Sequence, residues 1–311
     1  MTSAKHAKNV STAGHFELTI DGHKTTAFLK SVDGGQVKTS IIDEPIGHGN
    51  QRIKHTSVAE IEPITIDFGF AGAADLLKWI QDSWRREFGR RSGEIIHANF
   101  DMQPTYQYQF YDALLLETVF PALDGNSKDA GYVKIKVQPE RMVEERKSGG
   151  PQISGKMGSK QKLWSLSSFR FELDGIPEMK FVNHIDSFTV KQGVKKMYTG
   201  IDRFPQIEPT KLEFPNISGT LAAGYCDALL KWHGETNHRG ATDPKVQKHG
   251  AIEFLGPDKS TVLYRIELYE VGLYALSMPA STANAEQIKR IKFELYVGRM
   301  DIDGKGSLGL E

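Results

Sequence analysis

The sequence lacks most of the features that mark secreted or membrane-spanning proteins. Cys226 is the only cysteine among 311 residues, so an intrachain disulfide, a four-cysteine zinc site and a CxxC redox motif are all excluded. No apolar run approaches the about 18 residues of a transmembrane helix. The first residues contain no apolar stretch of signal-peptide length either. These absences predict a chain made in the cytoplasm, or exported without a cleaved signal, and not inserted into a membrane.

A surplus of charge of one sign is also missing. The 39 Lys and Arg residues balance 39 Asp and Glu residues, and hydrophobic residues make up 39% of the chain. These values exclude a wholly disordered chain and a polybasic nucleic-acid binder, although a local basic patch remains open. The composition is that of an ordinary globular protein, and the length predicts two domains.

The two halves of the sequence repeat each other. FELTIDG at 16–22 recurs as FRFELDG at 169–175, and LLKW at 76–79 recurs unchanged at 229–232. Further matches follow in the same order: IEPITIDF with IEPTKLEF, FYDALL with LYEVGL, and VKIKVQPERM with IKFELYVGRM. Because serial matches indicate a duplication, we predict two similar domains, at 14–142 and 167–303. Residues 143–166 are predicted as a linker and 304–311 as a flexible tail.

Each copy has the pattern of antiparallel strands with one helix. Phe16, Leu18 and Ile20 alternate with polar residues, which is the period of a strand. Apolar residues over 73–86 recur at helical spacing, and the second LLKW lies in a corresponding segment that begins near Leu221. We therefore predict a mainly β protein: two similar β-sandwich or barrel domains, each with one α-helix packed at the side.

Residues of the usual catalytic and ligand-binding kinds form no recognisable motif. Gly150–Lys156 fits the start of a phosphate-binding loop, but Met157 stands where that loop needs a hydroxyl, which favours a linker. His233 and His238 lie in a polar loop without a zinc-binding pattern. Cys226 falls within the second predicted helix, at a position that is Ala in the first copy, which favours packing. We predict no catalytic residue, no metal site and no cofactor.

The order of the motifs resembles the tail tube proteins of contractile phages and related injection systems. The matching stretches are FELTIDG, FLKSVDGGQV, ITIDFGF and DLLKWIQDSW, with a weaker second set of FRFELDG, KLEF, DALLKW and YRIELYEVGLYALSMP. Proteins of that family usually have one such domain and form hexameric rings around a channel. The resemblance therefore implies that three copies of this chain close a ring of six quasi-equivalent domains, and that such rings stack.

Two other interpretations remain open. A baseplate hub or tube initiator would form a single trimeric ring. A tandem β-barrel could instead bind a ligand or act as an enzyme, for which His48, His55, His233 and His238 are the groups to test. As partners the resemblance implies further copies of the chain, sheath and baseplate proteins, and DNA or protein cargo in the channel. It places the protein, once made, in a virion tail or an injection-system particle.

The resemblance also implies which side chains contact other components. The loops at 43–55 and 195–204 would contact the next ring, and the helices would lie outside the channel. The inter-ring candidates are Asp43, Glu44, His48, Asn50, Arg52, Lys195, Lys196, Tyr198, Asp202 and Arg203. A positive cluster is either a solvated helix end or a surface for an outer partner. It consists of Arg85, Arg86, Arg90 and Arg91.

Overall fold

The computed structural model describes residues 15–25, 27–47, 49–146, 150–153, 164–200, 203–238, 240, 246–278 and 289–303. The strands of the first half are β1 His15–Ile20, β2 His23–Lys24, β3 Leu29–Gly34, β4 Val37–Pro45, β5 Arg52–Ile61, β6 Ile64–Phe68, β7 Arg91–Ala98, β8 Pro104–Phe120, β9 Leu123–Asp124, β10 Val133–Gln138 and β11 Arg141–Glu145. Those of the second half are β12 Phe169–Leu173, β13 Val182–Ile185, β14 Phe188–Met197, β15 Gln206–Glu213, β16 Ile217–Ala222, β17 Lys248–Leu255, β18 Val262–Ser277, β19 Arg290–Tyr296 and β20 Arg299–Asp303. The helices are α1 Ala74–Trp84 and α2 Asp227–His233, with the helical turns η1 Pro177–Phe181, η2 Ala223–Tyr225 and η3 Gly234–His238.

A long bent strand, β8, joins the two layers of the first half. Its beginning pairs with β7 and β11, and its end pairs with β10. The layers are therefore β1-β7-β8-β11 and β8-β10-β6-β3. Asp112 lies at the bend with a positive φ of 52°, and its backbone N–H donates to Ser92 Oγ (3.1 Å). Such a break in the ladder lets the sheet turn over and enclose a core.

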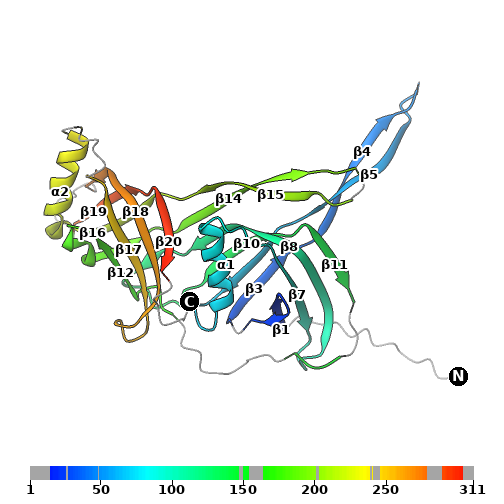
Figure 1. Ribbon diagram of the computed structural model, residues 1–311, viewed down its shortest axis with the longest axis horizontal. Coiled ribbons are helices and arrows are strands. Elements are labelled where there is room, and N and C mark those ends of the chain that lie inside the picture. The colour runs from blue at the N-terminus through cyan, green and yellow to red at the C-terminus, as the bar shows by residue number, and fades with distance from the viewer. Residues whose placement is uncertain are drawn as a thin grey trace.

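The second half has the same strand order. Its layers are β12-β17-β18-β20 and β18-β19-β16-β13, with β18 in the place of β8. Glu270 in β18 has a positive φ of 55° at the position that FYDALL and LYEVGL align with Asp112. The hairpins β4–β5 and β14–β15 also take the same place in the chain order of each half, after β3 and after β13 (both are labelled in Figure 1). The predicted fold class, mainly β with a helix beside each unit, is confirmed, whereas the duplication itself remains a prediction.

The buried side chains of both halves form one continuous hydrophobic cluster. Phe70 of the first half packs against Phe254 and Tyr264 of the second, at centroid distances of 5.2 and 5.1 Å. Trp164, which precedes the second half, packs against both Phe70 and Phe254. Since burial of apolar area stabilises a fold by about 25 cal/mol per Å², each half stabilises the other.

Some boundaries differ from the predictions. β11 runs to Glu145, into the predicted linker, because these residues pair with β8. The second helix begins later than predicted, since Leu221 is a residue of β16. Cys226 consequently lies just before α2, where its thiol donates to the carbonyl of Ala223 (2.9 Å). Part of the predicted linker and the predicted tail lie outside the described residues. Among the described helices, none has the length and apolar character needed to cross a membrane.

Candidate assembly interface

A strand of the second half extends the sheet of the first half. β14 pairs antiparallel with the end of β8, over Phe188–Lys191 and Glu117–Phe120, with Phe188 opposite Phe120. In return, β9 of the first half pairs with β13 of the second. The two halves are thus joined edge to edge by backbone hydrogen bonds, in the way that strands of separate chains add to an exposed sheet edge.

Phe120 lies at the centre of this joint. Its ring stacks on Phe188 and Phe254 of the second half, with centroids 4.9 and 5.6 Å away, and Trp84 of α1 packs edge-on at 6.1 Å. The Phe120 side chain is 0% exposed. The joint between the halves is therefore packed like a protein core.

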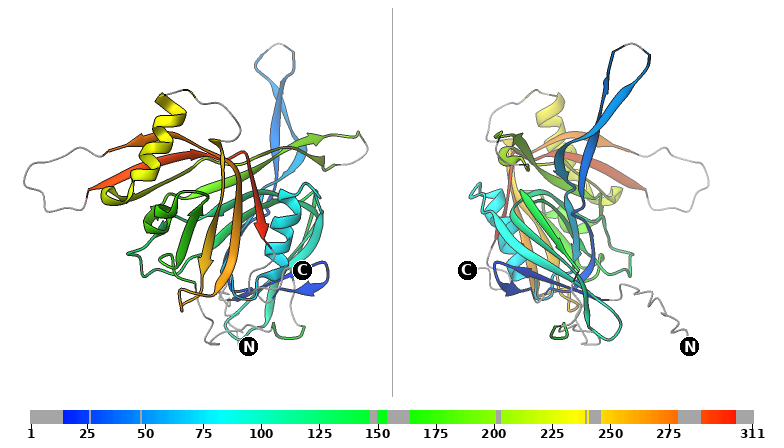
Figure 2. Two further views of the ribbon diagram at one scale, coloured as in Figure 1. Left: turned by 60° about the vertical axis from the view of Figure 1, so that its left-hand side comes forward. Right: turned by 90° about the vertical axis from the view of Figure 1, so that its right-hand side faces the viewer.

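Helix α1 forms the second part of the joint, lying against the end of β20 (Figure 2). The buried Gln81 donates from Nε2 to the carbonyl of Ile302 in β20 (2.9 Å). Arg85 donates to Asp301 (3.0 Å), and this hydrogen bond raises the pKa of Arg85. Because a buried amide without a partner is costly, the Gln81 contact ties the helix of one half to a strand of the other.

Arg90 anchors the β14–β15 hairpin to the first half. Its guanidinium pairs with Glu140, and it donates to the carbonyl of Ile207 (2.5 Å) and to Glu208 (3.2 Å), both in β15. Glu140 also accepts a hydrogen bond from the Ile207 N–H (2.8 Å). Charge-assisted hydrogen bonds that share partners are stronger than isolated ones, so this network holds the hairpin down.

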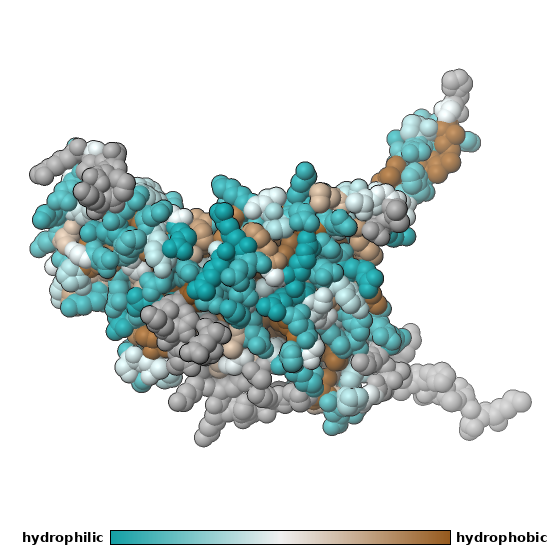
Figure 3. Space-filling view, viewed as in Figure 1, coloured by the Kyte–Doolittle hydropathy of each residue, from teal (hydrophilic) through white to brown (hydrophobic). Residues whose placement is uncertain are grey.

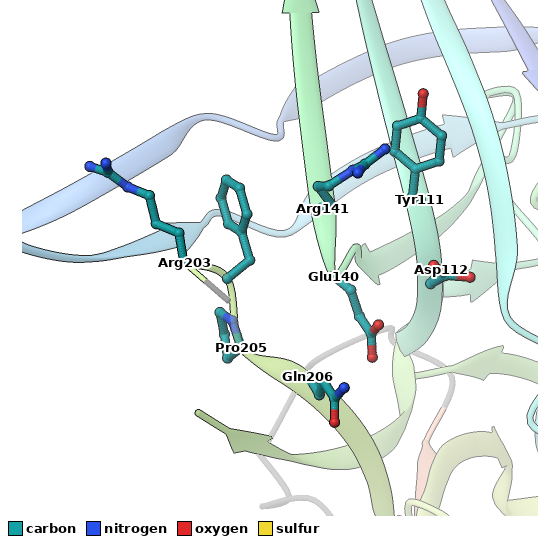
Figure 4. Close-up of a pocket in the computed structure, with 8 residues that line it drawn as sticks. Tyr111, Asp112, Glu140, Arg141, Arg203, Pro205 and Gln206 are labelled. Carbon is teal, nitrogen blue, oxygen red and sulfur yellow. The ribbon is translucent and has the colours of Figure 1, made fainter. Parts of the chain in front are cut away.

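An open cavity of about 350 Å³ lies beside this network, at the seam between the halves (Figure 4). The residues that line it are Tyr111, Asp112, Glu140, Arg141, Arg203, Phe204, Pro205 and Gln206. The Arg141 guanidinium lies over the Tyr111 ring, 4.5 Å from its centroid. Within the described part of the chain, no group of three or more His, Cys, Asp or Glu side chains is placed to hold a metal ion.

The β4–β5 hairpin is not held down in this way. Its strands form a separate two-stranded sheet that projects from the body (Figures 1 and 2). Exposed aliphatic side chains follow this arm: Val37, Ile41, Ile42, Ile46, Ile53 and Val58. Brown, hydrophobic atoms cover part of the arm in Figure 3. An isolated two-stranded hairpin is marginally stable in water, and grouped exposed apolar side chains mark contact sites. The arm is therefore a candidate for contact with another chain.

The predicted inter-ring residues lie towards the free ends of the two hairpins. At β4–β5 they are Asp43, Glu44, Asn50 and Arg52, and at β14–β15 they are Lys195, Lys196, Tyr198 and Arg203. Arg52 pairs with Asp43 across the first hairpin (3.0 Å), and Arg203 lines the cavity. His48 and Asp202 fall outside the described residues. A role of these side chains between rings remains a prediction.

The four arginines predicted as a possible outer surface have different surroundings. Arg85 and Arg90 bind the second half of their own chain, as described above. Arg91 pairs with Asp21 (2.7 Å) and Asp82 (3.4 Å). Arg86 is exposed at the end of α1, with a left-handed φ of 64°. Three of these side chains therefore stabilise the fold, and contact with an outer partner remains a prediction.

Sequence reasoning missed the joint between the halves. The repeat aligned Phe120-Pro121-Ala122 with Met278-Pro279-Ala280, but a repeat does not reveal that a strand of one half covers only one of these positions. The arm carried a usable signal. Ile41 and Ile42 are adjacent in a strand, so they point to opposite faces and cannot both enter one core.

These features describe a mainly β protein whose sheet edges are suited to pairing with a further unit. Residues 12–143 match the model of a protein family described as T4-like virus tail tube protein gp19. The predicted resemblance to tail tube proteins is thereby confirmed for this stretch, which is less than half of the chain. The matched family consists of structural tail tube proteins and not of enzymes, and the match supports this similarity for residues 12–143.

Three of the solved structures that match have low sequence identity to the chain. A chain of the PVC sheath-tube complex of an extracellular contractile injection system is 19% identical, with a TM-score of 0.41, covering 47% of this chain and 99% of that one. A chain of the anti-feeding prophage (AFP) baseplate is 12% identical, with a TM-score of 0.39, covering 47% and 98%. Hcp1 from Flavobacterium johnsoniae is 16% identical, with a TM-score of 0.28, covering 42% and 95%. No curated protein sequence matches the chain.

Proposed function

We propose that three copies of this chain form a ring of six quasi-equivalent domains around a channel, as part of the inner tube of a contractile tail or injection system. One observation carries the proposal: two units of the same strand order are joined by β14 on β8. Different surfaces of the two units meet in this joint, so it is heterologous, and repetition of a heterologous joint closes a ring or continues as a helix. The tail tube match supports closure.

Further parts of this proposal concern the assembled particle. The two domains would be 14–142 and 167–303, the products of a tandem duplication, which the shared strand order and the shared bend at Asp112 and Glu270 support. The hairpin tips would contact the next ring in a stack. Sheath and baseplate proteins would be the outer partners, and DNA or protein would pass through the channel. The chain, made in the cytoplasm, would end in a virion tail or an injection-system particle.

A single terminal ring, such as a baseplate hub or tube initiator, is the second candidate. The two hairpins differ near their tips: Ile41 and Ile53 are exposed on one, whereas Lys195 and Lys196 stand on the other. In a ring of three chains, these two different tips would alternate. That face would have threefold and not sixfold symmetry, which suits a ring that meets a threefold partner.

The oligomeric state of the purified full chain tests the proposal. Native mass spectrometry over a range of concentrations is expected to show assemblies in multiples of three chains. Electron microscopy then separates the two candidates, because a main tube protein yields stacked rings and a terminal component yields single rings. A chain that stays monomeric at high concentration would contradict both.

A further inference from the structure

The joint inside the chain serves as a template for a joint between chains. β14 adds to the end of β8 with Thr189 opposite Val119 and Val190 opposite Thr118. On its other edge the same stretch of β8 pairs with β10. Both edges of the end of β8 are thus occupied, and the side chains of Thr118 and Phe120 are buried.

The matching end of β18 has only one occupied edge. β19 pairs with it over Gly272–Ser277, and within the described residues no strand lies on the opposite edge. Met278 stands where β8 has Phe120, and its side chain is 68% exposed where that of Phe120 is 0% exposed. An open edge beside exposed apolar side chains is a site for adding a strand.

The strand that matches β14 in the first half is β4, and it has a free edge. Val32 of β3 pairs with β6, and Ile185 of β13 pairs with β16 at the corresponding position. Five residues further along each chain segment, Val37 therefore corresponds to Val190. β4 pairs only with β5 among the described strands. The open strand and the open edge stand at opposite ends of one chain (Figure 1), so they can meet only between chains.

A shared irregularity determines the alignment of β8 with β18. β8 pairs with β10 through a bulge next to Glu117, which lies opposite Lys136. β18 pairs with β19 through a bulge next to Ala275, which lies opposite Glu294 at the corresponding position. Because a bulge shifts the register by one residue, its recurrence means that Leu276 takes the place of Thr118.

We propose that β4 of one chain adds to the free edge of β18 of a second copy, antiparallel, with Val37 opposite Leu276 and Gln36 opposite Ser277. The inference rests on the proposed ring and names the strands that join its chains. The pairing would make the marginally stable β4–β5 hairpin part of a larger sheet, which stabilises it. It also makes a cross-strand pair of aliphatic side chains, which is favourable.

The helices agree with this placement. Leu77 of α1 is 0% exposed, while Leu230, its counterpart in α2, is 41% exposed. α1 is covered by β20, and the counterpart of β20 is β11, where Val143 is exposed. The neighbour that supplies β4 would therefore bring β11 against α2. The same second copy would thus supply the counterparts of both contacts seen within the chain, β14 on β8 and β20 on α1.

Disulfide cross-linking of the full chain tests the register. In a Cys226→Ala background, Val37→Cys and Leu276→Cys are made singly and together, and Gln36→Cys with Ser277→Cys forms a second set. Both sets are needed because neighbouring antiparallel pairs alternate between two Cα separations, of about 5.5 and 4.5 Å. After mild oxidation, covalent products are read on non-reducing gels. The doubly substituted chain is expected to form a ladder that ends at three chains, and the mixed single variants a covalent dimer.

Two controls accompany the test. Val190→Cys with Thr118→Cys should form a disulfide within one chain, which reports that the variants fold and oxidise. Val58→Cys with Leu276→Cys uses a somewhat more exposed side chain on β5, one strand away, and should give no specific product.

The possible outcomes separate the inference from the proposed function. Trimers without a cross-link in either set would overturn the inference and leave the ring intact. Specific cross-links that extend without stopping at three would support the strand pairing and overturn the closed trimer. A chain that neither associates nor cross-links would overturn both.

Discussion

The two hairpins occupy the same place in the strand order and have opposite surroundings. β14–β15 lies on β8 and is fastened by Arg90 and Glu140. β4–β5 projects from the body with its aliphatic side chains exposed (Figure 3). One hairpin therefore belongs to a contact that is complete within the chain, whereas the other has no such contact among the described residues. Substitutions at matched positions in the two halves test this difference.

The largest difference is expected between Phe120 and Met278. Phe120→Ala removes a ring packed between Phe188 and Phe254, and such losses cost about 3–5 kcal/mol. Met278→Ala removes an exposed side chain, and we expect the free energy of unfolding of the monomeric chain to change by less than about 0.5 kcal/mol. Urea denaturation of both variants measures this. Equal losses of stability would mean that Met278 is already covered within one chain.

A similar contrast is expected between the helices. Leu77 is buried and Leu230 is exposed at the matching position. Leu77→Ala should destabilise the chain by roughly 2–4 kcal/mol, whereas Leu230→Ala should hardly alter stability and should weaken association instead. Thermal unfolding gives the first effect, and the concentration dependence of the oligomer gives the second. A Leu230→Ala variant that assembles as the unchanged chain does would argue against a covered α2 face.

The ion pairs of the two hairpins should differ by a smaller amount. Arg90 holds β15 through several partners, and Arg90→Ala should cost about 1–3 kcal/mol. Arg52 forms an exposed pair with Asp43 (3.0 Å), and Arg52→Ala should cost less than about 1 kcal/mol. Hydrogen exchange of the β14 and β15 amides should quicken only in the Arg90 variant. Faster exchange in both variants would show that the two hairpins are not independent.

Tyr264 offers the smallest effect. It is buried in the core between the halves, and its hydroxyl has no hydrogen-bond partner within the described residues. Tyr264→Phe removes that unpaired group, so stability should stay the same or rise by up to about 1 kcal/mol. A clear loss of stability would indicate a partner for the hydroxyl.

The pH dependence of the same variant provides a second measurement. Burial raises the pKa of Tyr264 well above 10, while in the unfolded chain this phenol ionises near pH 10. A group whose folded pKa is raised stabilises the fold below its unfolded pKa and less above it. The unchanged chain should therefore lose more stability than Tyr264→Phe as the pH rises past about 10, as chemical denaturation can measure.

The sequence predicted features that depend on neighbouring residues and missed contacts between residues far apart in the chain. The alternation at Phe16, Leu18 and Ile20 predicted β1, because strand periodicity is local. The spacing around LLKW placed α1 to within a few residues but began the second helix too early, since Leu221 was drawn into β16 by pairing with Ile291 of β19. The arginine cluster could not be assigned. Asp301 lies far away in the chain, and nothing near Arg85 indicates that the two side chains meet.

Patterns along the chain were enough for the strand and helix types, for the repeat, and for the resemblance to tail tube proteins that residues 12–143 bear out. Side-chain periodicity and motif order can both be read from the order of the residues alone. Only the folded arrangement reveals that one edge of β8 is covered by β14 while the matching edge of β18 is open. Every residue type except proline offers the same backbone donor and acceptor at a sheet edge. The sequence of an edge strand therefore does not indicate which strand will pair with it.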